Sequence, residues 1–148
     1  MIFNKTIFRR RINQAIAALM CCGVLFGAAA AQSLKEIRAH EAEEKALNRE
    51  VAYTRSVCGN SFSASIDWRS AADWPESVSL TGACDGALGA LEAICRDGKG
   101  KIRAKRVTKF VCAGDGSGAS LRGGTLRYGA SPGDNGFADT KAVLDSQL

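Results

Sequence analysis

Two cysteines, Cys84 and Cys95, bracket a segment with helical periodicity, and their spacing constrains the fold more than any other feature of the sequence. Because a helix turns about 100° per residue, both side chains face the same side of this helix and lie about 16 Å apart along it. A disulfide requires Cα atoms within about 7 Å of each other. Each of these cysteines must therefore pair with a cysteine outside the helix, and the candidates beyond residue 31 are Cys58 and Cys112.

The segments on either side of this helix alternate between apolar and polar residues, which predicts strands over residues 61–68 and 101–112. A strand, helix and strand joined in this way favour parallel strands with a right-handed crossover. The helix then runs antiparallel to both strands, so the cysteine at each end of the helix lies near the cysteine of one strand. We predict the disulfides Cys58–Cys95 and Cys84–Cys112.

Local signals place the ends of this helix and the loop before it. Thr81, or a residue just after it, is a suitable N-cap, and Asp97-Gly98 provides a glycine stop. Residues 69–80 contain Asp73-Trp74-Pro75 and are predicted to form an irregular loop, with Trp74 folded over the core.

Two further strands and a helix follow Cys112. The sequence ASLRGGTLRY, residues 119–128, predicts a hairpin with a Gly-Gly primed turn, in a register that places Leu121 opposite Leu126. Residues 137–148 carry a helical apolar stripe with Asp134 or Asn135 as the cap. The predicted fold is α+β: a small disulfide-stapled domain of order β-α-β-β-β-α, with a mixed four-stranded sheet and helices on one face.

The N-terminal residues have the pattern of a secretory signal. A basic stretch, an apolar run and four alanines precede residue 32, and we predict that residues 1–31 are a signal peptide. An uncleaved membrane anchor is the alternative, because the apolar run approaches the roughly 20 residues that a membrane helix needs. The mature chain has no further stretch that predicts a stable membrane span.

The rest of the chain divides into two predicted parts. Residues 32–56 form a charged helical or partly disordered segment, which is either solvated or docked on the domain or a partner. Residues 57–148 form the compact α+β domain. Export places its cysteines in an oxidising compartment, where an even set most simply forms disulfides.

The net charge of +5 does not indicate nucleic-acid binding. Four of the 20 basic residues and none of the 15 acidic residues lie in the first 31 positions, which leaves 16 basic and 15 acidic residues. The charge is instead uneven within the domain, because residues 96–112 hold seven basic residues and only Asp97 as an acid.

The sequence disfavours catalysis by nucleophile and histidine, because His40 is the only histidine and lies before the predicted domain. No CxxC pair indicates a metal site, and the GDGSG segment lacks the remainder of a phosphate-binding or calcium-binding loop. Several carboxylates are available, but their spacing singles out no catalytic pair. We therefore predict no cofactor and no specific catalytic residue.

The outer face of the predicted sheet is basic and rich in hydroxyl groups. Its candidate contacts to an anion or a partner are Lys101, Arg103, Lys105, Lys109, Arg122 and Arg127. A solvated sheet whose lysines prevent edge pairing is the plainer interpretation, and binding to an acidic protein or an anionic envelope polymer is the functional one. Nucleic acid is disfavoured, because the aromatic residues of the strands are expected on the opposite face.

These features predict an exported, non-catalytic binding or inhibitor-like module with a basic open sheet face. The alternative is a small carboxylate-dependent hydrolase that acts on an anionic cell-envelope substrate. A structural envelope protein held by an uncleaved N-terminal helix is a third hypothesis.

Overall fold

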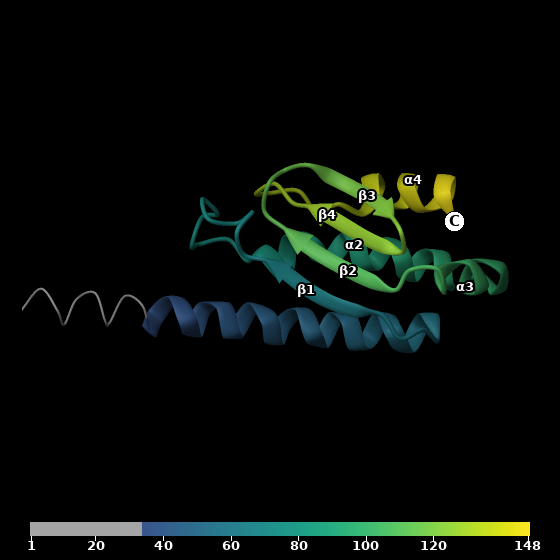
Figure 1. Cartoon of the computed structure of the whole chain (residues 1–148), viewed down its shortest axis with the longest axis horizontal. Coiled ribbons are helices and arrows are strands. Elements are labelled where there is room, and N and C mark those ends of the chain that lie inside the picture. Colours follow the sequence, from purple (N-terminus) through teal and green to yellow (C-terminus); the bar gives the residue numbers. More distant parts are fainter. Residues whose placement is uncertain (1–33) are drawn as a thin grey trace, which may run out of the picture. The chain divides into compact units, whose positions relative to one another are not determined.

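The computed structural model describes residues 34–148, so the predicted signal segment, residues 1–31, lies outside the described residues. The chain divides into two units, of which residues 34–40 are the described, helical part of the first. The second unit, Glu41–Leu148, begins with a helix over residues 41–58, here called the leading helix. Its other elements are β1 (Ser63–Asp67), α2 (Leu80–Cys95), α3 (Gly98–Ala104), β2 (Lys109–Ala113), β3 (Gly118–Arg122), β4 (Thr125–Gly129) and α4 (Phe137–Gln147) (Figure 1). Between residues 34 and 148, no helix is long and apolar enough to span a membrane.

The four strands form one mixed sheet in the order β1-β2-β4-β3. β1, β2 and β4 run parallel, and β3 is antiparallel to β4. The hairpin register pairs Leu121 with Leu126, as predicted. Gly123 and Gly124 have φ angles of 52° and 78°, the left-handed values that a primed turn requires. The predicted α+β fold and its mixed four-stranded sheet are confirmed.

Both predicted disulfides are present. Cys58 bonds Cys95 with a Cα–Cα distance of 4.9 Å, and Cys84 bonds Cys112 with a distance of 5.9 Å. All four cysteines are buried. Cys58 ends the leading helix shortly before β1, and Cys112 lies near the end of β2. The two bonds join opposite ends of α2 to these positions, so α2 runs antiparallel to β1 and β2.

The core lies between the sheet and its helices. Phe110 and Leu126 occupy neighbouring positions on the inner face of β2 and β4, and both are fully buried. α2 covers this face with Leu88 and Leu91, which are 1% exposed. Trp74 packs against the same core and donates its indole N–H to the carbonyl of Val78 at 2.8 Å, so the loop before α2 covers the core as predicted.

The leading helix packs beside α2 and runs parallel to it. Thr81 donates its hydroxyl to the carbonyl of Glu43 at 3.0 Å, and Thr54 donates its hydroxyl to Glu92 at 2.7 Å. The first contact lies near the start of both helices and the second near their ends, and the Cys58–Cys95 bond follows. Leu47 and Val51 on the same helix are 2% and 0% exposed. Residues 41–58 are therefore a packed helix rather than a solvated one.

The helix caps differ from the predicted ones. Ser79, not Thr81, is the N-cap of α2 and accepts a hydrogen bond from the Gly82 N–H. The Glu43 carboxylate accepts the Thr81 N–H at 2.8 Å, so a neighbouring helix supplies part of the cap. α4 has Gly136 at its N-cap position, although Asn135 still accepts the N–H of Phe137 at 3.2 Å.

The prediction of a strand from residue 101 was wrong for its first part. Residues Gly98–Ala104 form α3, and β2 begins only at Lys109. Asp97, predicted as part of a helix stop, is the N-cap of α3 and accepts the N–H groups of Lys99 and Gly100. Gly100 and Ala104 are buried, so two small residues one helical turn apart let α3 pack closely.

Two buried threonines allow a matched test of how a hydrogen bond to a buried hydroxyl group affects stability. Thr54 and Thr140 are both 0% exposed, but the Thr140 hydroxyl has no hydrogen-bond partner among the described residues. We expect Thr140→Val to raise the free energy of unfolding by about 1 kcal/mol, because a desolvated, unsatisfied hydroxyl is removed. Thr54→Val should lower it by about 2 kcal/mol, because the bond to the Glu92 carboxylate is lost. Urea unfolding of both variants checks this, and equal effects of the same sign would contradict it.

Candidate anion-binding surface

The structure brings five of the six predicted contact residues to one end of the domain. Lys101 and Arg103 lie on α3, Lys105 is its C-cap, Lys109 begins β2, and Arg122 ends β3. The end of α2, the start of β2 and the turn between β3 and β4 meet at this end (Figure 1). We call these five residues and Lys99 the basic end.

Strand register places the two basic residues of the sheet, Lys109 and Arg122, in one row. Lys109 pairs with Thr125, and Thr125 pairs with Arg122, so these three residues form one row across β2, β4 and β3. Neighbouring strands are about 4.8 Å apart, which places the Cα atoms of Lys109 and Arg122 roughly 10 Å apart on the same face. Ser63 of β1 extends this row on the other side of Lys109. The row thus carries two cations flanked by hydroxyl groups.

All residues of the basic end are exposed, and their charges are not compensated locally. Within residues 34–148, none of these six side chains has a carboxylate within ion-pair distance. Asp97 is the acid nearest in sequence to the cations of α3, and its carboxylate accepts two backbone N–H groups at the start of this helix. Arg106, which follows them, donates to the carbonyl oxygens of Gln147 and Leu148 and so holds the C-terminus. The basic end can therefore attract an anion without first breaking an internal ion pair.

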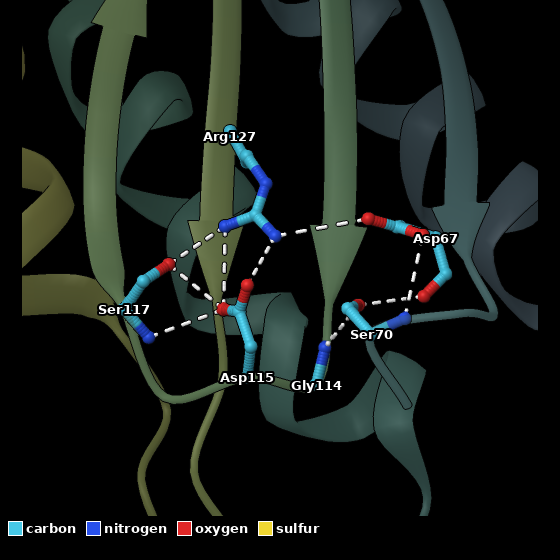
Figure 2. A network of polar contacts seen from close by, with 6 residues as sticks. All are labelled: Asp67, Ser70, Gly114, Asp115, Ser117 and Arg127. Atoms are coloured by element: carbon cyan, nitrogen blue, oxygen red, sulfur yellow. Dashed lines mark hydrogen bonds and ion pairs between the residues drawn. The ribbon is translucent and has the colours of Figure 1, made fainter. Parts of the chain in front are cut away.

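Arg127, the sixth predicted residue, is separate from the basic end and already has carboxylate partners. Its guanidinium group donates to Asp115 at 2.5 Å and to the Ser117 hydroxyl at 2.6 Å (Figure 2). Asp67 lies 3.8 Å away on its other side. These contacts, above all the hydrogen bond to Asp115, raise the pKa of Arg127. Arg127 thus fastens β4 to the loop after β2 and to the end of β1.

The same contacts lower the pKa of Asp115 to about 2. The hydrogen bond from Arg127 is the largest cause, and bonds from Ser117 add to it. A carboxyl group with such a pKa stays ionised at neutral pH and is a poor proton donor. The arrangement is suited to joining strands rather than to general acid catalysis.

Next to this ion pair, Ser70 links the ends of β1 and β2. Its hydroxyl donates to the carbonyl of Asp67 at 2.6 Å and accepts the N–H of Gly114 at 3.0 Å (Figure 2). Arg127 was predicted as a candidate contact on the outer face of the sheet, without a carboxylate partner. The sequence held a signal for this pairing, because Asp67 ends β1 and Asp115 follows the end of β2 by two residues. The carboxyl ends of neighbouring parallel strands meet at one edge of a sheet.

Replacing Asp115 by Asn should lower the free energy of unfolding by about 1 kcal/mol at pH 7, because the side chain is 38% exposed and solvent screens the ion pair. The folded-state pKa is lowered, so this stabilisation is complete above the unfolded pKa near 4 and is lost as pH falls towards 2. The difference between wild type and variant should therefore shrink over this range. Urea unfolding at pH 7, 4 and 2.5 measures it.

Asp145→Asn is the matched control, since Asp145 forms a 2.6 Å ion pair with Lys141 within α4 and is 51% exposed. An i,i+4 pair of this kind contributes only about 0.3–0.5 kcal/mol. An equal loss of stability in the two variants would contradict the role given to the Asp115–Arg127 pair.

Residues 34–148 contain no cluster of three or more histidine, cysteine or acidic residues that could hold a metal ion. The two disulfides indicate an oxidising, non-cytoplasmic environment.

Comparisons with protein-family models, with curated proteins and with solved structures found no significant match.

Proposed function

We propose that the protein is an exported, non-catalytic binding or inhibitor-like module that contacts an anionic partner through its basic end. The observation that supports this most strongly is the concentration of exposed, unpaired cations on α3 and on the adjoining ends of β2 and β3. Arg127 and Lys141, which lie outside the basic end, each pair with a neighbouring aspartate. A cationic surface without internal partners raises the association rate with anionic molecules and favours their binding.

Export rests on two independent features. The pattern of residues 1–31 is that of a secretory signal peptide. The two disulfides are consistent with folding in an oxidising compartment such as the periplasm or the extracellular space. N-terminal sequencing or mass spectrometry of the protein from its native host tests this proposal, and a chain that retains residue 1 would contradict cleavage.

An acidic protein or an anionic envelope polymer fits the basic end better than a nucleic acid does. Phe110 and Tyr128 are buried on the inner face of the sheet, so they are not available to stack bases. The open face instead presents Ser63, Ser65, Lys109 and Thr125. Sheet proteins that bind single strands normally stack bases on exposed aromatic residues.

The test is binding of the protein to an immobilised polyanion at low and moderate salt. The variant Lys101→Glu/Lys105→Glu should bind roughly tenfold more weakly, and the wild-type affinity should fall steeply with salt. The control Lys45→Glu/Arg69→Glu has the same net charge but changes exposed residues outside the basic end. Equal weakening in both double variants, or retention that salt does not affect, would argue against this surface.

The hydrolase alternative has less support. A pair of carboxylates, Asp67 and Asp115, does lie at the carboxyl ends of parallel strands, where many sheet enzymes bind ligands. However, Asp115 is held ionised by Arg127, and general acid catalysis needs a carboxyl group with a raised pKa. An activity screen with envelope polysaccharides tests this alternative. Turnover that Asp67→Asn or Asp115→Asn abolishes in a folded protein would revive it.

A further inference from the structure

The most exposed large apolar side chain among the described residues lies in the middle of the basic end. Ile102 on α3 is 69% exposed, more than Tyr53 at 57% or Phe137 at 40%. A single exposed apolar residue needs no functional explanation by itself. The position of Ile102 among the cations of α3 is the feature that requires a functional explanation.

Helical geometry places Ile102 at the outermost point of α3. The buried residues Gly100 and Ala104 define the face of α3 that packs on the domain. At about 100° per residue, Ile102 points about 180° away from the middle of that face. Its side chain therefore projects directly away from the domain.

The cations of α3 surround this apolar side chain. By the same geometry, Lys99 and Lys105 lie about 60° to either side of Ile102, and Lys101 and Arg103 lie about 100° to either side. All four are exposed, and none has a carboxylate partner among residues 34–148. The outward surface of α3 is thus one apolar side chain within a ring of four positive charges.

We infer that α3 binds the surface of an anionic phospholipid bilayer, with Ile102 inserted between the headgroups and the surrounding cations in contact with them. This inference rests on the proposed function and specifies its partner. A bilayer offers negative charge at its surface and hydrocarbon directly beneath it, in the order that this side-chain pattern requires. An anionic polysaccharide would use the cations but leave Ile102 in water. An acidic protein with an apolar pocket is the competing partner.

The small size of the apolar contact makes the binding depend on charge. One isoleucine and a few cations give weak, reversible association, in contrast to the insertion of a membrane-spanning helix. Each cation near an anionic surface is expected to contribute about fivefold to the affinity. Binding should therefore disappear in moderate salt and on vesicles of neutral lipid.

The first experiment measures co-sedimentation of the full chain with vesicles of phosphatidylglycerol and phosphatidylcholine at low salt. Lys101→Gln/Lys105→Gln should weaken binding about 25-fold, and Ile102→Ala should weaken it about fivefold. Phe137→Ala is the matched control, because Phe137 is also an exposed apolar residue but lies at the start of α4, outside the basic end. All chains share the same N-terminal residues, so differences between variants report on α3.

A second measurement reports insertion directly. Ile102→Trp places an indole at the outermost point of α3, and brominated lipids quench a tryptophan that enters the bilayer. Quenching should increase in Ile102→Trp over wild type, and Tyr53→Trp on the leading helix should show no such increase. Equal quenching in the two variants would overturn the inference.

The outcomes separate this inference from the proposed function. Charge-dependent binding to vesicles that Ile102→Ala weakens supports both. Binding to a soluble polyanion or an acidic protein with no effect of Ile102→Ala or Ile102→Trp on vesicles overturns the lipid inference and leaves the proposed function intact. Absence of binding to every anionic probe overturns both.

Discussion

Replacing Cys84 and Cys112 together by alanine is expected to lower the free energy of unfolding by about 3.5 kcal/mol. The bond closes a loop with a sequence separation of 28, and its removal restores the conformational entropy of that loop to the unfolded chain. Cys84 and Cys112 are also 0% exposed, so alanine at both positions leaves unfilled space in the core. For a domain of this size, the loss is a large part of a total stability of about 5–15 kcal/mol.

The double variant Cys58→Ala/Cys95→Ala is the natural comparison. Its bond spans 37 residues, and loop entropy grows only with the logarithm of length, so a similar loss of about 4 kcal/mol is expected. Guanidinium unfolding of the purified variants measures both effects. A change below about 1 kcal/mol in either variant would contradict the view that these bonds stabilise the folded domain through the unfolded chain.

Gly136→Ala is expected to lower the free energy of unfolding by about 3 kcal/mol. A Cβ at this position would lie 2.2 Å from Cζ of Tyr128 and 2.5 Å from another ring atom. Tyr128 is 1% exposed and cannot move aside without disturbing the core. Gly136 also has a φ of 67°, a left-handed conformation that costs alanine about 1–2 kcal/mol.

Gly123→Ala separates the two contributions. Gly123 has a φ of 52°, and nothing lies within 4 Å of the position that its Cβ would take. Gly123→Ala should therefore lower the free energy of unfolding only by the cost of a left-handed backbone conformation for alanine, about 1 kcal/mol. Thermal and urea unfolding of both variants measure the difference, and equal losses would mean that contact with Tyr128 is unimportant.

Tyr128 gives a second readout for the Gly136 variant. Burial, with a further contribution from Asp134, raises the pKa of Tyr128 to about 12. If alanine at position 136 displaces the ring towards solvent, this pKa should move down towards 10. Ultraviolet titration of the phenol near pH 11 follows the shift, and an unchanged titration would show that the ring keeps its place.

Most of the fold could be predicted because its signals are local or follow from simple geometry. The hairpin register followed from a Gly-Gly turn between two short alternating strands. The disulfide pairing followed from the spacing of Cys84 and Cys95 and from the direction of a helix between parallel strands. Neither prediction depends on the detailed packing of side chains.

The secondary structure of residues 98–108 was harder to predict, because the segment carries signals for both a strand and a helix. Apolar and basic residues alternate from Lys101 onwards, which is typical of a strand. Asp97 is also a suitable N-cap, and Gly100 and Ala104 are spaced for a helix that packs closely. Packing of the small residues against the domain favours the helix, and in this helix Ile102 points outwards.

The sequence by itself determined the order of elements, the cysteine pairs and the concentration of positive charge in residues 96–112, because each depends on spacing and residue type along the chain. The tertiary structure decided which basic residues of the domain form ion pairs. Arg127 met Asp115 and Asp67 only because three parallel strands end at the same edge, whereas the residues of α3 met no acid. Ion pairing depends on distances between segments far apart in the sequence, and periodicity along one segment carries no information about them.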